Sequence, residues 1–221
     1  MTAPEPNDTA PDRAVPNPAV LSEADHAALV AAKRTLRAAV RVRRRSRAPQ
    51  RRAAADSART ARLIAFLADR VETGLTVAAY LSTDTEPGTL EFIAWCAAHD
   101  LPVLLPLTST DTPDWAGYSG PDDLRLGRHG IGEPTGPALG PDTIAAVDLV
   151  VMPGLAGNEQ GQRLGQGSGW YDRALAGVDG PVRVLLLNDD EVLPAIPAEP
   201  TDQPVDVIIT ELRTLVCTPA G

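Results

Sequence analysis

The chain has 221 residues, of which 43% are hydrophobic and 22% are charged, and its net charge is −9. These values are typical of a folded globular protein with one domain, or one domain and a tail. No apolar run reaches the roughly 18 residues that a membrane-spanning helix needs. Two distant cysteines, Cys96 and Cys217, exclude a disulfide framework, and the three histidines fit no zinc-binding spacing. We therefore expect a cytoplasmic protein whose polypeptide alone binds no metal.

The charge is distributed unevenly along the chain. Residues 33–62 contain 12 of the 20 Lys and Arg residues and one acid, so this stretch carries +11 and the remainder carries −20. A basic arm on an acidic body predicts an anionic ligand at the arm, either a nucleic acid or a polyphosphate. The chain has 19 arginines and a single lysine, Lys33. This lysine remains either by chance or for a functional reason.

The first part of the chain predicts a leader and two helices. Residues 1–20 contain five prolines and no apolar signal-peptide block, so we expect a disordered leader, followed by a single α/β domain over residues 21–221. Ser22 and the acids after it predict the start of a helix that runs to about Arg47, where Pro49 stops it. A second helix fits residues 50–71.

After Gly74, short apolar runs alternate with helical stretches. Buried strands are predicted at residues 76–81, 102–106, 148–155, 182–187 and 205–210, and helices at 87–99 and from 170 onward. Residues 111–141 are rich in turn formers and are predicted to be mostly loop, with short strand pieces. Strands that are apolar on both faces and alternate with helices indicate an α/β fold, with a mostly parallel open sheet flanked by helices in three layers. In such sheets, ligands bind at the carboxyl ends of the strands.

A glycine-rich segment is the strongest candidate for chemistry. Gly165, Gly167 and Gly169 alternate between a predicted strand and a predicted helix, where glycines let backbone N–H groups approach an anion beside the positive end of the helix. Arg163 and Arg173 flank this turn and can neutralise phosphates, and Asp172 is a candidate Mg²⁺ ligand. The segment is neither a Walker A loop nor a dinucleotide fingerprint. The alternative is a purely structural turn.

Other candidate residues are less specific. Lys33 and Arg37 lie four residues apart on one helix face and can clamp a polyphosphate, or they belong to a solvated basic face. Glu86 follows the first predicted strand at its ligand end, and the alternative is a solvated loop acid. Trp115 and Tyr118 can stack on a flat heterocycle, or they close over the core.

Further motifs accompany the glycine-rich segment in chain order. They are Lys33-x-x-Leu36-Arg37, Tyr80-Leu81, Glu86-x-x-Thr89, Gly130-Ile131-x-Glu133-Pro134, Pro153-Gly154-Leu155-Ala156, the string from Arg163 to Arg173, and Ile209-Thr210-Glu211. Together they make residues 28–212 resemble the 5-formyltetrahydrofolate cyclo-ligase family, also called 5,10-methenyltetrahydrofolate synthetases. The string Arg-Leu-Gly-x-Gly-x-Gly-aromatic-Tyr-Asp-Arg is highly specific, and the order of the shorter motifs adds weight.

The resemblance implies an enzyme that uses MgATP to convert 5-formyltetrahydrofolate to 5,10-methenyltetrahydrofolate, ADP and phosphate. It implies that the formyl oxygen is phosphorylated, that the N10 amine attacks the activated carbon, and that phosphate leaves. The implied ATP-binding residues are Lys33, Arg37, Arg163, Leu164, Gly165, Gln166, Gly167, Ser168, Gly169, Trp170 and Tyr171. The implied catalytic residues are Arg163 and Tyr171, the implied Mg²⁺ ligand is Asp172, and the implied folate contacts are Glu86, Trp115 and Tyr171.

The sequence also departs from the family pattern. Gly157-Asn158 stand where the family usually has Phe-Asp, and Thr201-Asp202 stand where it often has His-Asp. These departures favour, as one alternative, a catalytically weak relative that binds folate or nucleotide. A second alternative is a nucleic-acid-binding protein that uses the arginine-rich helices; the acidic body and the lack of aromatics in residues 33–62 argue against it. We expect a monomer that binds a small-molecule substrate and neither nucleic acid nor membranes.

Overall fold

The computed structural model describes residues 22–71, 74–83 and 85–218. The predicted leader at residues 1–20 lies outside the described residues, so the division into a leader and one domain over residues 21–221 stays a prediction. Among the described residues, no helix combines the length and the apolar character needed to cross a membrane.

Two long helices open the described chain. Helix α1 (Glu23–Ser46) begins as predicted after Ser22, whose side chain accepts a hydrogen bond from the Asp25 backbone. Helix α2 (Pro49–Val71) follows at once, with proline as its first residue, where the missing N–H is not needed. The shorter helices are α3 (Leu90–Ala98) and α4 (Trp170–Ala174). Helix α3 begins three residues later than predicted, because Thr89 donates its hydroxyl to the Tyr80 carbonyl oxygen and Tyr80 donates to that of Pro87.

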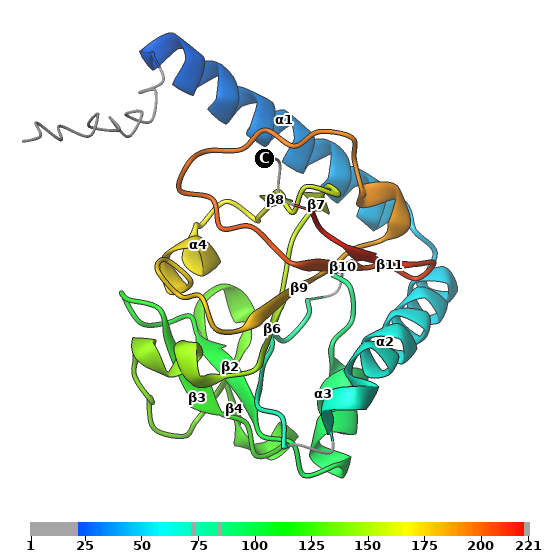
Figure 1. The fold of residues 1–221 in the computed structure, drawn as a ribbon, viewed down its shortest axis with the longest axis vertical. Coiled ribbons are helices and arrows are strands. Elements are labelled where there is room, and N and C mark those ends of the chain that lie inside the picture. Colours follow the sequence, from blue (N-terminus) through cyan, green and yellow to red (C-terminus); the bar gives the residue numbers. More distant parts are fainter. Residues whose placement is uncertain (1–21, 72–73, 84, 219–221) are drawn as a thin grey trace, which may run out of the picture.

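The central sheet has seven strands in the order β11-β10-β9-β6-β1-β2-β3 (Figure 1). Its five inner strands are parallel: β1 (Val77–Ala78), β2 (Val103–Leu107), β6 (Leu149–Met152), β9 (Val182–Leu186) and β10 (Val207–Ile209). Two edge strands are antiparallel: β3 (Asp114–Gly117) and β11 (Thr214–Val216). The predicted mostly parallel sheet is confirmed, whereas β11 was not predicted and β3 lies in the segment expected to be mostly loop.

Two small hairpins complete the strands. One pairs β4 (Leu124–Leu126) with β5 (Gly132–Pro134), and the other pairs β7 (Ala156–Gly157) with β8 (Arg163–Leu164). Short 3₁₀ turns lie at Pro121–Asp123, Arg128–Gly130, Pro141–Ala146 and Asp189–Glu191.

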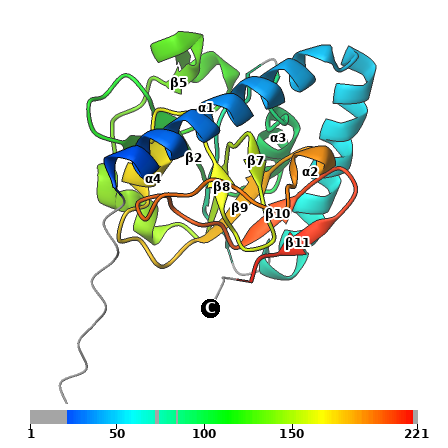
Figure 2. The same cartoon turned by 90° about the horizontal axis from the view of Figure 1, so that it is seen from above.

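Alternate residues of the sheet enter two separate cores, as a sheet covered on both faces requires. In β1, Val77 packs with residues of α2 and α3, whereas Ala78 packs with Ile144 and with residues of α4. The sheet therefore forms the middle of three layers. Helix α1 belongs to neither covering layer: it lies across β7 and β8 (Figure 2), where Val40 packs against Leu164. This position brings α1 to the carboxyl ends of the parallel strands.

Candidate active site

A pocket of about 820 Å³ opens at the carboxyl ends of the strands. Its walls come from α1, from the segments that follow β1, β2 and β6, from the glycine-rich segment, and from residues 199–202. It brings together most of the predicted site residues, namely Lys33, Arg37, Glu86, Arg163, Leu164, Gly165, Gln166, Gly167, Ser168, Gly169, Trp170, Tyr171 and Asp172. Of the predicted residues, Trp115, Tyr118 and Arg173 do not line it.

Two glycines of the glycine-rich loop at residues 165–169 have backbone conformations that favour glycine. Gly167 has φ of 117° and Gly169 has φ of 63°, and L-residues with side chains rarely adopt these values. No backbone N–H of this loop has a hydrogen-bond partner in the described part of the chain. Because α4 has only five residues, its dipole adds little, and the free N–H groups of the loop are the main backbone donors available to an anion.

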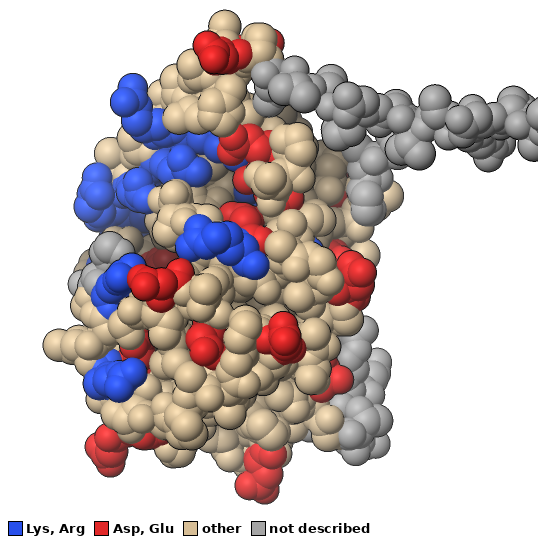
Figure 3. All heavy atoms as spheres, turned by 90° about the vertical axis from the view of Figure 1, so that its left-hand side faces the viewer, with Lys and Arg blue, Asp and Glu red and all other residues tan. Residues whose placement is uncertain are grey.

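Basic side chains from α1 line one wall of the pocket. Arg37 Nε donates to the Gly165 carbonyl oxygen at 3.0 Å, and Arg41 Nη2 donates to the Gln166 carbonyl oxygen at 2.8 Å. Both arginines thus hold the glycine-rich loop through neutral acceptors and keep their positive charges available. Figure 3 shows Lys and Arg side chains gathered on one part of the molecular surface.

Lys33 is engaged by two carboxylates at the end of this wall. Its Nζ donates to Glu199 Oε2 at 2.7 Å and to Asp202 Oδ2 at 2.5 Å, and the side chain is 5% exposed. The hydrogen bond from Lys33 lowers the pKa of Glu199, and the positive charges of Lys33, His26 and Arg37 act in the same direction. The predicted phosphate lysine is therefore at the pocket but paired with protein acids.

Arg163 and Asp172, both predicted site residues, form an ion pair. Arg163 Nη2 donates to Asp172 Oδ1 at 2.7 Å, its Nη1 donates to the Pro153 carbonyl oxygen, and its buried Nε has no partner. The Gln203 backbone N–H donates to the same Asp172 oxygen at 3.1 Å. No group of three acidic, His or Cys side chains suited to a metal ion occurs in the described residues. A magnesium ion at Asp172 would therefore need ligand oxygens from a bound phosphate.

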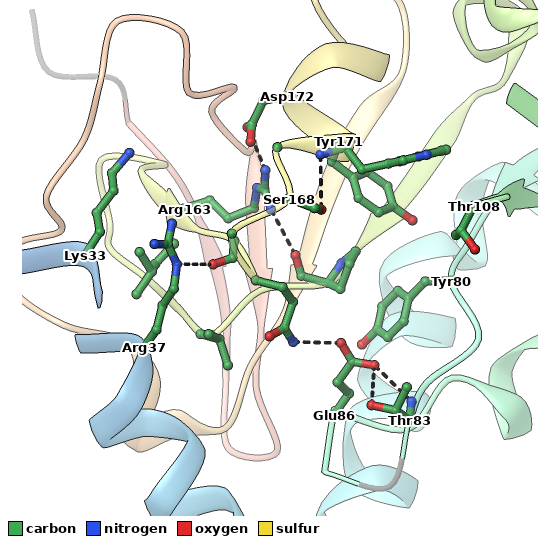
Figure 4. Close-up of a pocket in the computed structure, with 18 of the residues that line it drawn as sticks. Lys33, Arg37, Tyr80, Thr83, Glu86, Thr108, Arg163, Ser168, Tyr171 and Asp172 are labelled. Atoms are coloured by element: carbon green, nitrogen blue, oxygen red, sulfur yellow. Dashed lines mark hydrogen bonds and ion pairs between the residues drawn. The ribbon is translucent and has the colours of Figure 1, made fainter. Parts of the chain in front are cut away.

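Glu86 is linked to the glycine-rich loop by its side chain (Figure 4). Gln166 Nε2 donates to Glu86 Oε1 at 2.9 Å, and the backbone N–H and hydroxyl of Thr83 both donate to Glu86 Oε2 at 2.9 Å. The carboxylate is thus held between the end of β1 and the loop. Of the two readings of Glu86, the structure favours a held acid at the pocket over a freely solvated one.

Three aromatic side chains pack at the base of the pocket. Trp170 and Tyr171 line it, whereas Trp115 on β3 is fully buried behind them, with ring centroids 5.0 and 6.1 Å from theirs. In this structure Trp115 therefore contacts the pocket only through its neighbours. The Tyr171 hydroxyl is buried without a partner, and this burial raises its pKa well above the usual value, against the charge of Arg163. Tyr171 is thus a protonated hydrogen-bond donor.

These features agree with known proteins. The family model described as the 5-formyltetrahydrofolate cyclo-ligase family matches residues 29–211. The chain belongs to this family. A 5-formyltetrahydrofolate cyclo-ligase from Mycolicibacterium smegmatis is 35% identical over 150 residues, which cover 65% of this chain and 77% of that protein. An Escherichia coli protein of the same name is 29% identical over 177 residues, which cover 77% and 96%.

Solved cyclo-ligase-family structures share the fold. The Aquifex aeolicus 5,10-methenyltetrahydrofolate synthetase superposes with a TM-score of 0.74 at 26% identity, covering 86% of this chain and 94% of that one. The Mycoplasma pneumoniae 5,10-methenyltetrahydrofolate synthetase has a TM-score of 0.65 at 20% identity, covering 81% and 98%, and supports the fold alone.

The two departures from the cyclo-ligase pattern lie in different places, since Gly157 and Asn158 lie outside the pocket whereas Thr201 and Asp202 line it. Gly157 sits in β7, where an added Cβ would approach Leu185 to 2.8 Å, and Asn158 is buried and bonds Gln162 in the turn after β7. Neither residue lines the pocket. A larger residue at Gly157 would clash, so the glycine fits the packing of this chain. The second departure is Thr201-Asp202, in which Asp202 forms an ion pair with Lys33.

Several lining residues were missed by the sequence analysis. Arg41 and Arg45 continue the four-residue spacing of Lys33 and Arg37, and this spacing would have found them. Glu199 and Asp202 carried no local signal for their contact with Lys33. The same holds for Thr108, whose position depends on buried Glu133, which accepts from the Thr108 backbone at 2.8 Å and hydroxyl at 2.7 Å.

Proposed function

We propose that the protein converts 5-formyltetrahydrofolate to 5,10-methenyltetrahydrofolate, using ATP and releasing ADP and phosphate. The observation that carries this proposal is one pocket that contains the glycine-rich loop, the cations of α1 and Glu86. Its volume of about 820 Å³ lies within the usual range for small-molecule sites, so the pocket has room for sizeable ligands. Action in the cytoplasm as a monomer stays a prediction from the sequence.

The pocket residues fit the triphosphate of ATP. The free backbone N–H groups of residues 165–169 and the guanidinium of Arg37 are donors that lack an anionic partner within the described residues. Lys33 and Arg163 add positive charge once their carboxylate partners exchange for phosphate. Phosphoryl transfer depends chiefly on positioning and charge neutralisation, and this set of donors supplies both. Leu164 and Ser168 complete the loop that holds the nucleotide.

Asp172 fits a magnesium ion shared with phosphate oxygens, since Mg²⁺ usually takes one or two carboxylates and keeps other oxygen ligands. Magnesium at Asp172 would compete with Arg163 for the same carboxylate. Metal binding would therefore release the Arg163 guanidinium toward the phosphates, and Arg163 would serve the reaction by neutralising transferred charge.

Asp172→Asn tests this arrangement. The change keeps the shape and removes the charge, so we expect a higher magnesium requirement and a much lower kcat, with the fold intact. Turnover measured as a function of Mg²⁺ concentration gives the answer. A fall in stability with an unchanged magnesium requirement would instead assign Asp172 to the ion pair with Arg163.

The proposed reaction has two chemical steps. The formyl oxygen attacks the γ-phosphorus and ADP leaves, N10 then bonds to the formyl carbon, and the carbon–oxygen bond breaks as phosphate departs with the oxygen and N10 loses its proton. Arg37 and Arg163 neutralise the transferred phosphoryl group, and Tyr171 donates a hydrogen bond. Glu86 binds the folate beside the loop, and Trp115 supports the ring contacts of Tyr171 and Trp170 from behind.

The direct test is incubation of the purified protein with 5-formyltetrahydrofolate and MgATP. We expect the methenyl chromophore to form in proportion to the ADP released, and neither product when ATP is omitted. Arg163→Ala should abolish most of the turnover. Binding of both ligands without chromophore formation would identify a catalytically weak relative, and salt-sensitive nucleic-acid binding without ATP binding would identify the other alternative.

A further inference from the structure

The Glu86 segment, residues 85–89 between β1 and α3, carries the acid that the proposed function assigns to folate binding. It is tied to the end of β1 by hydrogen bonds. The Tyr80 hydroxyl donates to the Pro87 carbonyl oxygen at 2.8 Å, and the Thr89 hydroxyl donates to the Tyr80 carbonyl oxygen at 2.5 Å. Tyr80, Thr83 and Glu86 all line the pocket. The position of the Glu86 segment therefore sets the shape of one pocket wall.

Helix α2 holds the Glu86 segment from outside the pocket. The Gly88 backbone N–H donates to Asp56 Oδ1 at 2.8 Å. The approach is close, because a Cβ on Gly88 would lie 2.9 Å from the carboxyl carbon of Asp56, and a larger residue would push the carboxylate away. Asp56 does not line the main pocket. The contact therefore acts on the pocket wall from behind.

Arg59, one turn further along α2, orients the carboxylate of Asp56. Its Nη2 donates to the same Oδ1 atom at 2.9 Å, and its side chain is 2% exposed. The Nε and Nη1 atoms of Arg59 are buried and have no hydrogen-bond partner in the described part of the chain, which makes this arginine costly to bury. A second, small cavity is lined by Arg59, Asp56, Glu86 and Pro87, together with other residues. The ion pair thus lies directly behind the Glu86 segment.

We infer that Asp56 is a positioning residue for folate binding, an inference that rests on the proposed function. Oriented by Arg59, its carboxylate holds Gly88 and thereby keeps Glu86, two residues earlier, in place against the folate. Asp56 itself contacts neither ligand. Its loss should weaken binding of 5-formyltetrahydrofolate and leave binding of ATP unchanged, because the donors proposed for ATP lie on α1 and on the glycine-rich loop.

The test is calorimetric titration of the wild type and of three variants with 5-formyltetrahydrofolate. For Asp56→Ala we expect a Kd about tenfold higher than that of the wild type, within the range for groups coupled through one hydrogen-bond network. Asp56→Asn should recover most of the affinity, because its amide oxygen still accepts from Gly88 although the ion pair with Arg59 is lost. Asp148→Ala is the matched control and should keep the wild-type Kd, because Asp148 accepts from the Thr76 backbone N–H at 2.8 Å but lies outside the pocket.

Two further measurements separate positioning from a general loss of structure. In Asp56→Ala, the Kd for a non-hydrolysable ATP analogue should stay within about twofold of the wild-type value, the range within which independent sites add. In a Glu86→Ala background, Asp56→Ala should raise the Kd for folate no further. Equal folate Kd values in Asp56→Ala and the wild type, or full additivity with Glu86→Ala, would overturn the inference while the proposed function stands. Failure of the wild type to bind 5-formyltetrahydrofolate would overturn both.

Discussion

Helix α1 carries two sets of arginines that differ in what they meet. Arg44 and Arg47 point to the protein interior and share Glu191, whereas Arg37 and Arg41 face the pocket and meet only neutral oxygens. The residue type and the helix are the same in both sets. The partners alone separate arginines that stabilise the fold from arginines that we propose for ligand binding.

The interior set forms an ion-pair network around Glu191. Arg44 is 1% exposed and Glu191 is fully buried, and two nitrogens of the arginine donate to the two carboxylate oxygens at 2.9 and 2.7 Å. Burial by itself would raise the pKa of Glu191, but the hydrogen bonds and charge of Arg44, with the bonds from Asn188, lower it. Glu191 therefore stays ionised and fixes α1 to the turn after β9.

Removing Arg44 should have the largest effect. Arg44→Met leaves the Glu191 charge buried with only part of its network, which typically costs about 3–5 kcal/mol. Urea unfolding measures this loss, and Arg45→Met on the neighbouring exposed position should change the free energy of unfolding by less than about 0.5 kcal/mol. Similar values for the two variants would contradict the division of α1 into two sets.

Removing Arg37 should reduce ligand affinity rather than the free energy of unfolding. Arg37→Met deletes a bond to a charged ligand, worth about 1.5–3 kcal/mol, so the affinity for a non-hydrolysable ATP analogue should fall roughly 10- to 150-fold. Calorimetric titration measures this affinity. Arg62→Met is the control, since Arg62 on α2 also donates to a backbone carbonyl oxygen but lies outside the pocket. An unchanged affinity in Arg37→Met would remove this arginine from the site.

A substitution in the glycine-rich loop should have an effect of intermediate size. Gly167→Ala adds a Cβ at φ of 117° and should destabilise the fold by about 1 kcal/mol, while also weakening nucleotide binding. Gly120→Ala is the matched variant, because Gly120 has φ of 144°, lies outside the pocket and has no atom near its missing Cβ. Both variants should lose stability, but only Gly167→Ala should lose affinity. Equal affinities would show that residues 165–169 are only a turn.

Lys33 shares a property with each set, because it faces the pocket and is also paired with acids. Replacing Lys33 should have the smallest effect on stability. Lys33 lowers the folded-state pKa of Glu199, so the pair contributes stability above the unfolded pKa of about 4.3 and loses it as pH falls through the folded value. The stability difference between the wild type and Lys33→Met should therefore shrink in acid. Chemical unfolding at pH 7 and pH 3 tests this, and a difference that grows in acid would refute it.

Local patterns predicted the parts of the fold and site that lie close together in sequence. The parallel strands and the cap at Ser22 depend on residues within a few positions. Short strand pieces were expected within residues 111–141, but antiparallel β3 was not located there, because its four residues, Asp114–Gly117, show no readable alternation. Strand β11 was missed for a similar reason, since only three residues pair with β10.

Contacts between distant segments could not be predicted in the same way. Lys33 contacts Glu199 and Asp202, which lie 166 and 169 positions later in the chain. No local pattern near these two acids predicts the contact. Trp115 illustrates the same limit: an aromatic residue between turn formers resembles a pocket residue, yet its strand places it behind Trp170 and Tyr171. The sequence thus predicted elements formed by neighbouring residues more securely than contacts between distant segments.

The Arg44–Glu191 pair also constrains how the chain matures during synthesis. Its partners are 147 positions apart, so at about 5–20 residues per second the ribosome adds the acid roughly 7–30 s after the arginine. Throughout that interval Arg44 lacks the carboxylate that it meets in the folded protein. The pocket wall that α1 supplies therefore gains this anchor only after Glu191 has been synthesised.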